Sequence, residues 1–589
     1  MKHSKIIFLI LLAVFIYSCE KHEPFQKRSG NDYSETDTFN SVTGDMIIMR
    51  LNQEPSGLNP FTSKDEYSGM ILSYIFEPLM KNADISGSEV NPWVAESFEE
   101  SQDHLTYTYS IDKNVTFSDG TKLTTNDIIF TFKLLLNRAN GRAVYENDLI
   151  DKVEIVDNNS LKFRIKFKKV YYNNYDVINS IKIVPKHIWD PEGYTDKYSF
   201  EDCKDSANAF NNLYMKKIIE RIESVDFSRD QKYLIGTGPY ILDKWDTGNE
   251  IHLKRNENYW RTGLDFGSSY VNKIIIKIIP DDEIAIIAAK NNEIDLMNVQ
   301  NSKYYINEFS TPEKFNLRNV TGYYNHYHYI GYNHTNLLFS DLKTRQALAY
   351  LVNKSAIIEK IHFGLAEQVN SHYCINDKIY RNIEITETPY DLEKAKNMLK
   401  EAGWADNNGD GILDKEINGK NVEFKFTYLN NGNQTRRNTL LVIRDDLKKA
   451  GIQADITDIE WSIFLEMLNK GQFEGFIGSW VLSYPPDYYN YFHSSVSNGN
   501  GSIYVRYKNP VLDSLCEIHL KETNENNRIL ISKKIQKVLY DEQVYTFLFS
   551  TKIKYIYSNR FKNARFIDSP YLKFNLCEWW VPTENQKYK

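Results

Sequence analysis

Cysteine is scarce in this sequence, and long apolar runs are confined to its first residues. Five of the 589 residues are cysteine, and no two of them stand in the Cys-x-x-Cys spacing that is typical of zinc sites. Beyond residue 17 no stretch reaches the roughly 20 apolar residues that span a bilayer. The run from 274 to 287 is interrupted by Pro280 and several charged residues. We therefore predict neither a zinc domain nor a membrane-spanning protein.

The sequence also lacks blocks of basic residues. Its 71 Lys and Arg are slightly outnumbered by 78 Asp and Glu, a net charge of −7, which argues against a nucleic-acid partner. Aromatic residues make up 14% of the chain. They could form a stacking surface, although the abundance of Lys, Asn and Ile favours a compositional bias of the genome. The length exceeds the ~250–300 residues at which a single core stops growing, so we expect more than one lobe.

Motifs of common hydrolases and nucleotide-binding enzymes are missing from the chain after its first residues. There is no Gly-x-Ser-x-Gly elbow, no His-Glu-x-x-His pair and no P-loop. The segment 236–239, Gly-Thr-Gly-Pro, lacks the third glycine of a dinucleotide-binding loop, and Pro239 has no N–H to donate, so we interpret it as a structural turn. Acidic pairs occur throughout, but sequence gives no distance between them, so a glycosidase pair stays open.

Two short patterns suggest metal ligands. His326 and His328 would share one face of a strand and could chelate a cation, but their Tyr-rich surroundings favour a structural role. The segment 406–411 begins like a calcium-binding loop, yet Ile417 stands where the closing Glu belongs. Asp414 could still supply a ligand, against the alternative of an Asn/Gly-rich turn. We expect no cofactor and no metal site, with calcium at 406–414 as the open alternative.

The first residues predict export. Lys2 and Lys5 precede an apolar run from 6 to 17 that is too short to span a bilayer. Cys19 follows a small residue and resembles the lipidated cysteine of a bacterial lipobox; plain secretion is the alternative. The polar segment 20–43 predicts a flexible tether. We expect the other four cysteines to be buried free thiols: Cys203, Cys374, Cys516 and Cys577.

Hydrophobic patterns predict a mixed α/β protein of several lobes. Apolar residues alternate with polar ones over 105–111 and 161–167, which is typical of half-buried strands. Thr124 and Asp127 match a capping box before a helical period. Asp391 is a candidate N-cap for a helix that ends at Gly403. The remaining elements that we expect are a strand at 45–50, helices at 348–361 and a helix at 440–450 that is stopped by Gly451.

Several short motifs stand in a characteristic order along the chain. They are Glu54 to Pro60, Phe117 to Thr121, Leu123 to Asp127, Gly236 to Tyr240 with Trp245, Leu253 to Trp260, Asn292 to Leu296, Arg345 to Leu348, Glu393 to Gly403, and Trp480 to Ser495. In this order they resemble the family 5 solute-binding proteins, which are the oligopeptide, dipeptide and nickel receptors of bacterial ABC importers. The resemblance covers nearly the whole chain after the tether.

The resemblance implies an α/β clam-shell of two lobes, with an extra subdomain inserted in lobe I. The chain would cross to lobe II near Met297 to Tyr304 and return near Val544 to Ser550. The ranges that we expect are a lipoprotein signal peptide at 1–18, a lipidated cysteine and tether at 19–44, lobe I at 45–300 with the inserted subdomain at about 83–210, lobe II at 301–543, and a return to lobe I at 544–589. A solute that contacts both lobes favours their closure.

The resemblance also implies where a ligand would bind. Trp480 belongs to a cleft-lining motif and could stack on a ligand or cover its backbone, against the alternative of a core Trp. Peptide-binding members often carry an acidic residue three positions later, but Ser483 stands there and offers no charge for an α-amine. Asp487 is a candidate substitute. By analogy with the family, Asn59 and Asn298 are further candidates, and each could equally belong to a structural loop.

We therefore predict a lipid-anchored receptor, not an enzyme, that captures an oligopeptide and delivers it to an ABC permease. We expect it to be a monomer in the periplasm or at the cell surface, with no nucleic-acid partner. The aromatic content and Ser483 keep an oligosaccharide or a metal chelate open as the cargo. An exported hydrolase is the alternative from another class, and the missing nucleophile and metal motifs count against it.

Overall fold

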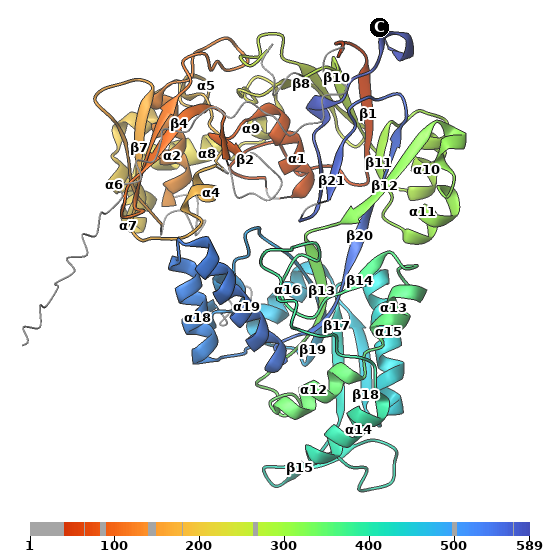
Figure 1. The fold of residues 1–589 in the computed structure, drawn as a ribbon. Coiled ribbons are helices and arrows are strands. Elements are labelled where there is room, and N and C mark those ends of the chain that lie inside the picture. Colours follow the sequence, from red (N-terminus) through yellow and green to blue (C-terminus); the bar gives the residue numbers. More distant parts are fainter. Residues whose placement is uncertain are drawn as a thin grey trace, which may run out of the picture.

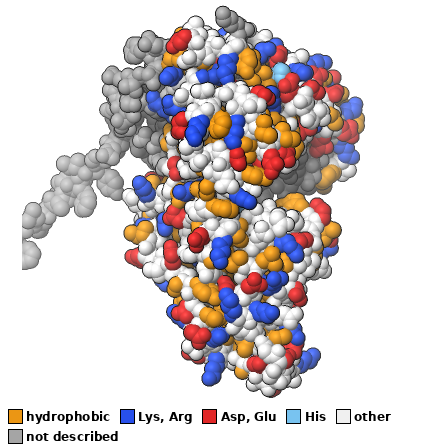
Figure 2. Space-filling model, turned by 90° about the vertical axis from the view of Figure 1, so that its right-hand side faces the viewer, with side chains coloured by type: hydrophobic (Ala, Val, Ile, Leu, Met, Phe, Trp, Pro, Cys, Tyr) orange, Lys and Arg blue, Asp and Glu red, His pale blue; other side chains and the backbone are white. Residues whose placement is uncertain are grey.

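The computed structural model describes residues 41–63, 65–82, 90–138, 149–179, 181–262, 269–496, 504–568 and 570–588. The expected signal peptide, Cys19 and most of the tether lie outside these residues. The chain forms an upper and a lower body (Figure 1). The two bodies meet at a narrower waist, and acidic and basic side chains mix there on the face that Figure 2 shows. Among the described residues, no helix has the length and apolarity needed to cross a membrane.

Lobe I, the upper body, is built on one end of a long mixed sheet. Strand β1 lies between β10 and β11 and runs parallel to both, while β9 and β8 continue the sheet in antiparallel fashion. Buried apolar residues of β1 and β10 pack beneath α1. The elements of lobe I are β1 (Met46–Leu51), α1 (Glu66–Ile75), α9 (Asp226–Arg229), β8 (Tyr240–Asp246), β9 (Glu250–Arg255), β10 (Lys273–Ile278), α10 (Asp282–Lys290), β11 (Leu296–Asn298), α11 (Ser302–Glu308), η4 (Pro312–Phe315), β12 (Leu317–Tyr323), β21 (Phe566–Asp568), β22 (Leu572–Phe574), η6 (Leu576–Glu578) and η7 (Thr583–Asn585).

A separate four-stranded antiparallel sheet in the order β4-β5-β7-β6 forms a subdomain beside lobe I (Figure 1). The predicted alternation is confirmed, because every second residue of β5 and β7 is buried. Asp127 accepts from the Thr124 backbone N–H and completes the predicted capping box. Its elements are β2 (Met80–Asn82), β3 (Val90–Pro92), β4 (Ala95–Glu100), β5 (Thr106–Ile111), α2 (Thr125–Leu136), β6 (Ile150–Ile155), β7 (Lys162–Phe167), α4 (Asn174–Asn179), α5 (Lys186–Trp189), η3 (Tyr194–Lys197), α6 (Phe200–Lys204), α7 (Ser206–Asn211) and α8 (Leu213–Ile222).

Lobe II, the lower body, carries the other end of the long sheet. Parallel strands β18, β17 and β19 continue into antiparallel β13, and helices cover both faces. Its elements are β13 (His326–Tyr332), α12 (Leu342–Tyr350), α13 (Lys354–Lys360), β14 (Ala366–Gln368), α14 (Leu392–Glu401), β15 (Asp414–Ile417), β16 (Lys420–Glu423), β17 (Lys425–Asn430), α15 (Gln434–Lys449), β18 (Gln453–Asp458), α16 (Trp461–Lys470), β19 (Gly475–Val481), α17 (Tyr489–Phe492), η5 (Ser494–Val496), α18 (Pro510–Lys521) and α19 (Glu525–Asp541).

One strand, β20 (Thr546–Ser558), belongs to both lobes. Its first part pairs with β13 and β14 of lobe II, and its second part, from Lys552, pairs with β12 and β11 of lobe I. The chain therefore crosses between the lobes at 323–326 and returns within β20.

The first crossing thus differs from the expected position near Met297 to Tyr304. Strand β12 stays in lobe I, because Leu317 shares a small core with Ile286 and with Ile556 of β20. The boundary expected at residue 300 is therefore too early by the length of α11, η4 and β12.

Two helix predictions and one turn prediction can be compared directly with the structure. Asp391 caps α14 as expected. Helix α15 begins at Gln434 and not at residue 440, since Asn433 accepts from the Arg436 N–H as the N-cap. At Gly236 and Gly238 an added Cβ would lie 2.0 Å and 2.4 Å from backbone carbonyl oxygens of α1. These glycines are required for close packing, which supports a structural role for the segment 236–239.

Candidate functional site

The carboxyl ends of the parallel strands of both lobes meet near the same part of β20. In lobe I, Asn298 at the end of β11 pairs with Tyr555. In lobe II, Val481 at the end of β19 pairs with His326, whose Nε2 lies 3.0 Å from Oγ1 of Thr551. Ligands of open α/β sheets bind beyond such strand ends. The region where the lobes face each other is therefore the candidate site.

Trp480 lies at the end of β19 in lobe II and is partly exposed. Tyr329 and Tyr504 stack on its indole at centroid distances of 5.9 Å and 5.7 Å, and Tyr491 meets it edge-on at 5.2 Å. Neither its indole N–H nor the Tyr545 hydroxyl has a hydrogen-bond partner among the described residues. Much of the aromatic surface of Trp480 is thus used inside lobe II, and a ligand would meet its remaining edge.

Ser483 and Asp487 lie together in the loop after β19. The Ser483 hydroxyl accepts from the Asp487 backbone N–H at 3.0 Å. The Asp487 carboxylate is buried and accepts from the side-chain amide of Asn490 at 2.6 Å. Burial raises the pKa of Asp487, although the hydrogen bonds from Asn490 oppose the shift. The loop thus holds the Asp487 carboxylate next to Ser483, which itself carries no charge.

The two lobe I candidates have different surroundings. Asn59 is fully buried, and its amide donates to the Ile222 carbonyl at 2.7 Å and accepts from the Phe61 N–H at 2.9 Å. These bonds join the loop after β1 to the end of α8 in the inserted subdomain. Asn298 is partly exposed beside the crossing strand, and its side-chain oxygen has no hydrogen-bond partner among the described residues. Of the two, Asn298 has the freer polar group.

Sequence reasoning missed a cation at the strand ends of lobe II. Arg436 lies in the first turn of α15 and is partly buried. Burial lowers its pKa, and its charge in turn helps to lower the pKa values of His326 and His328, for which burial is the larger cause. The helix was expected to begin too late to include Arg436. The signal that could have revealed it is Asn433, a good N-cap residue.

The inserted subdomain contacts lobe II away from β20, where α18 and α19 rise toward it in Figure 1. The Tyr172 hydroxyl donates to the Pro486 carbonyl at 2.8 Å, and its backbone N–H donates to the Leu520 carbonyl at 2.9 Å. The ring meets His519 edge-on at 5.2 Å, and the Arg528 guanidinium lies 4.9 Å from its centroid. Tyr172 therefore joins the two lobes next to the Asp487 loop.

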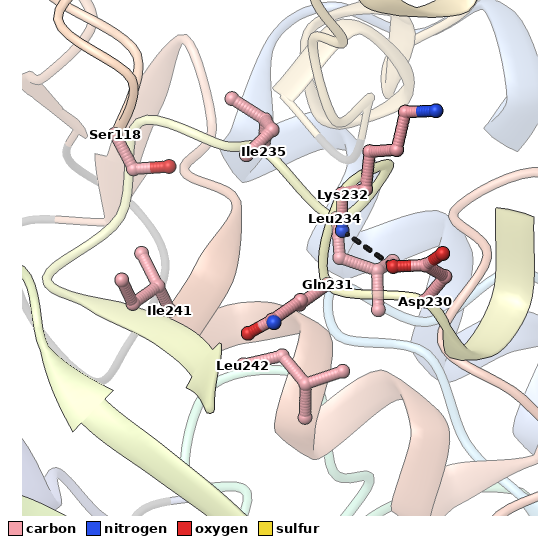
Figure 3. A pocket seen from close by; sticks show the side chains of 8 residues that line it. All are labelled: Ser118, Asp230, Gln231, Lys232, Leu234, Ile235, Ile241 and Leu242. Carbon is pink, nitrogen blue, oxygen red and sulfur yellow. Dashed lines mark hydrogen bonds between the residues drawn. The ribbon is translucent and has the colours of Figure 1, made fainter. Parts of the chain in front are cut away.

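One cavity among the described residues lies away from this meeting of the lobes. It has a volume of about 360 Å³, and its walls are the loop 230–235, the start of β8 and Ser118 (Figure 3). All of these belong to lobe I and its subdomain. A second cavity, of about 10 Å³, lies inside lobe II beside Lys354.

The two patterns that suggested metal ligands, His326 with His328 and the segment 406–411, make contacts within the protein. The His326 and His328 rings meet edge-on at 5.1 Å, and burial lowers the pKa of His326 to about 4. The Asp406 carboxylate accepts from the backbone N–H groups of Gly409 and Gly411. In the part of the chain that the structure describes, no three His, Cys, Asp or Glu side chains group as metal ligands. The four described cysteines are buried and free, as expected.

Comparisons with known proteins match this architecture. The model of the bacterial extracellular solute-binding proteins, family 5, matches residues 89–502. The oligopeptide-binding protein AppA of Bacillus subtilis is 30% identical over 580 residues, which cover 97% of each chain. Its solved structure in complex with a nonapeptide has a TM-score of 0.72 at 29% identity and covers 92% of this chain and 100% of that one.

A second solved structure, NikZ of Campylobacter jejuni in complex with Ni(L-His), has a TM-score of 0.69 at 23% identity and covers 91% of this chain and 99% of that one. At this identity the likeness concerns the fold. The two-lobe architecture, the match over most of the chain and the full-length relative lead to one conclusion: this chain belongs to the bacterial extracellular solute-binding proteins of family 5.

Proposed function

We propose that this chain is the substrate-binding receptor of an ABC importer and that its solute is an oligopeptide. The observation that carries the proposal is the meeting of parallel strand ends from two lobes, in a chain that is similar over 97% of its length to an oligopeptide-binding protein. A solute at this place would contact both lobes and favour their closure. The protein acts as a receptor, without catalysis, and hands its solute to a membrane permease.

The oligopeptide is preferred over a metal chelate because of the relatives. The relative with a nickel complex is only 23% identical, whereas the relative with a nonapeptide is 29% identical. The neutral Ser483 remains compatible with a peptide if Asp487, held in the same loop, provides the negative charge for the α-amine.

We further propose that Cys19 anchors the mature protein to a membrane through lipid and that residues 20–43 form the tether. We also propose that the receptor is a monomer outside the cytoplasm. The support is the basic and apolar start of the chain followed by Ser18-Cys19. Metabolic labelling with a fatty acid tests the anchor. We expect incorporation in the wild type and none in Cys19→Ser, and label that persists in the variant would contradict it.

Native mass spectrometry of the purified protein, before and after unfolding and refolding, tests the function. We expect a spread of bound masses at amino-acid increments, which disappears on refolding and returns when a peptide mixture is added. A single discrete mass, or a refolded protein that ignores peptides, would contradict the oligopeptide. Turnover of a peptide or sugar substrate above background would contradict the receptor role itself.

A substitution at Trp480 tests the place of the cleft. Because the indole packs against three tyrosines, we expect Trp480→Ala to lower the melting temperature and to weaken peptide binding together. Trp480→Phe keeps part of the stacking and should restore most of the stability. Calorimetric titration with peptide measures the affinity, and thermal melting measures the stability. Unchanged peptide affinity in a folded Trp480→Ala protein would make the residue a core Trp alone.

A further inference from the structure

The small cavity inside lobe II is enclosed by segments that are distant in the sequence. Its walls come from α12, the start of α13, the residues after β14, the loop before α14, the end of α19 and the start of β20. Its volume of about 10 Å³ suffices for one occupant of about the size of a water molecule. Most of the side chains that line it are polar, namely Lys354, Asn370, Thr388, Tyr540, Gln543 and Thr546. The cavity is therefore suited to a single small polar or charged occupant.

Lys354, the first residue of α13, contributes a buried cation to this cavity. It is 5% exposed, and its ammonium donates to Oδ1 of Asn370 at 3.1 Å, which uses one of its three N–H donors. The described residues provide no carboxylate at ion-pair distance from it. Burial lowers the pKa of Lys354 to about 8, although the charge of Glu387 opposes the shift. At neutral pH most molecules therefore still carry this charge, and a buried charge without a partner is costly.

Hydroxyl groups at the same cavity still have a proton to donate. Thr546, the first residue of β20, is 1% exposed, and its Oγ1 has no hydrogen-bond partner in the described part of the chain. The Thr388 hydroxyl donates to the Tyr540 hydroxyl at 3.5 Å, so the O–H of Tyr540 itself remains available as a donor. Together with the ammonium of Lys354, these groups favour an occupant that accepts hydrogen bonds.

We propose that Lys354, Thr546 and Tyr540 hold one monatomic anion, chloride, inside lobe II. The anion accepts from the ammonium and the two hydroxyls, and its charge compensates the buried cation. A sulfate, phosphate or carboxylate has several heavy atoms and is too large for a cavity of about 10 Å³. The charge of Lys354 opposes a metal cation, and a water molecule would leave that charge uncompensated. The site stabilises lobe II and does not depend on the identity of the solute.

Thermal melting in matched salts tests this site. The wild type is melted in sodium chloride, sodium bromide and sodium gluconate at one ionic strength. An anion that binds only the folded state shifts the unfolding equilibrium about 11-fold when its concentration is ten times its dissociation constant. We therefore expect the melting temperature to rise, and the rise to saturate, as chloride or bromide replaces gluconate. A melting temperature that is the same in all three salts would overturn the proposal and would favour water as the occupant.

A matched pair of lysine variants separates the site from a general salt effect. Lys354→Met removes the buried charge and keeps a long side chain, so it should abolish the difference between halide and gluconate. The control is Lys360→Met on the same helix, where the lysine is exposed. The control should keep the wild-type difference. A halide effect of the same size in Lys354→Met and in the wild type would overturn the site.

Two further measurements keep the test decisive if Lys354→Met does not fold. Thr546→Val removes one hydroxyl donor and nearly keeps the shape of the side chain, so it should require several-fold more halide for the same stabilisation. A crystal of the wild type grown in bromide should show an anomalous scattering peak within hydrogen-bond distance of Nζ of Lys354. An unchanged halide requirement in Thr546→Val together with no bromide at this position would overturn the proposal.

Discussion

The Tyr172 contact leads to a quantitative prediction about closure. Tyr172 lies in the inserted subdomain, and its hydroxyl donates to the Pro486 carbonyl of lobe II at 2.8 Å. Because the contact joins the lobes away from the crossing strands, it exists only while they are close together. Tyr172→Phe removes this one hydrogen bond and keeps the ring against His519 and Arg528. The variant should therefore fold normally and favour separation of the lobes.

The size of the effect follows from the bond that is lost. A neutral hydrogen bond contributes about 1 kcal/mol net, which is about fivefold in the ratio of joined to separated lobes. Where the joined state is the minor state of the free protein, the apparent affinity for solute falls by the same factor. Tyr172→Ala also removes the aromatic and cation–π contacts, which add about 1–2 kcal/mol, so its affinity should fall several-fold further.

Calorimetric titration with a bound peptide, together with small-angle scattering of the free and loaded protein, measures both quantities. Tyr214→Phe is the control, because Tyr214 lies in the same subdomain, is 39% exposed and packs beside Tyr194. We expect the control to match the wild type. Wild-type affinity and unchanged scattering for both Tyr172 variants would refute the role of this contact in closure.

Three further substitutions test the packing. Gly236→Ala would place a Cβ 2.0 Å from the Ile75 carbonyl oxygen and should lower the melting temperature strongly, whereas Gly69→Ala, in open space on α1, should not lower it. Glu77→Ala leaves the buried indole N–H groups of Trp93 and Trp260 and the Tyr259 hydroxyl without their acceptor. We expect the free energy of unfolding, measured with urea, to fall by about 3 kcal/mol or more. A fall of less than about 1 kcal/mol would contradict a stabilising role of this network. Burial lowers the pKa of His372 to about 3, so the stability that its neutral form provides is complete above about pH 6.5 and falls as the pH drops toward 3. His372→Gln should weaken this acid dependence of the melting temperature, and an unchanged dependence would assign it to other groups.

Local patterns in the sequence predicted local structure well. The alternation over 105–111 and 161–167 became β5 and β7, since half-burial in a sheet needs only a period of two. The capping box at Thr124 marked the start of α2 because its hydrogen bonds lie within four residues. The two-lobe architecture was predicted from the resemblance to the family, because no single local pattern indicates it.

Features that depend on distant residues could not be predicted in the same way. The lobe boundary was misplaced because β12 is held in lobe I by β20, whose residues lie more than 200 positions later. The surroundings of Trp480 depend on Tyr329, which no spacing rule connects to it. Arg436 was missed for a local reason, because Asn433 was not taken as an N-cap.

The position of β20 also determines when the protein can fold. This strand lies in the middle of the long sheet, between β13 and β11, yet it comes from residues 546–558 of a 589-residue chain. During synthesis, β13 and β11 are both made before β20, the strand with which they pair. Neither lobe can complete its sheet before almost the entire polypeptide has been produced, and such long-range pairing is slow to form. The central strand therefore delays completion of the long sheet in both lobes until the end of translation.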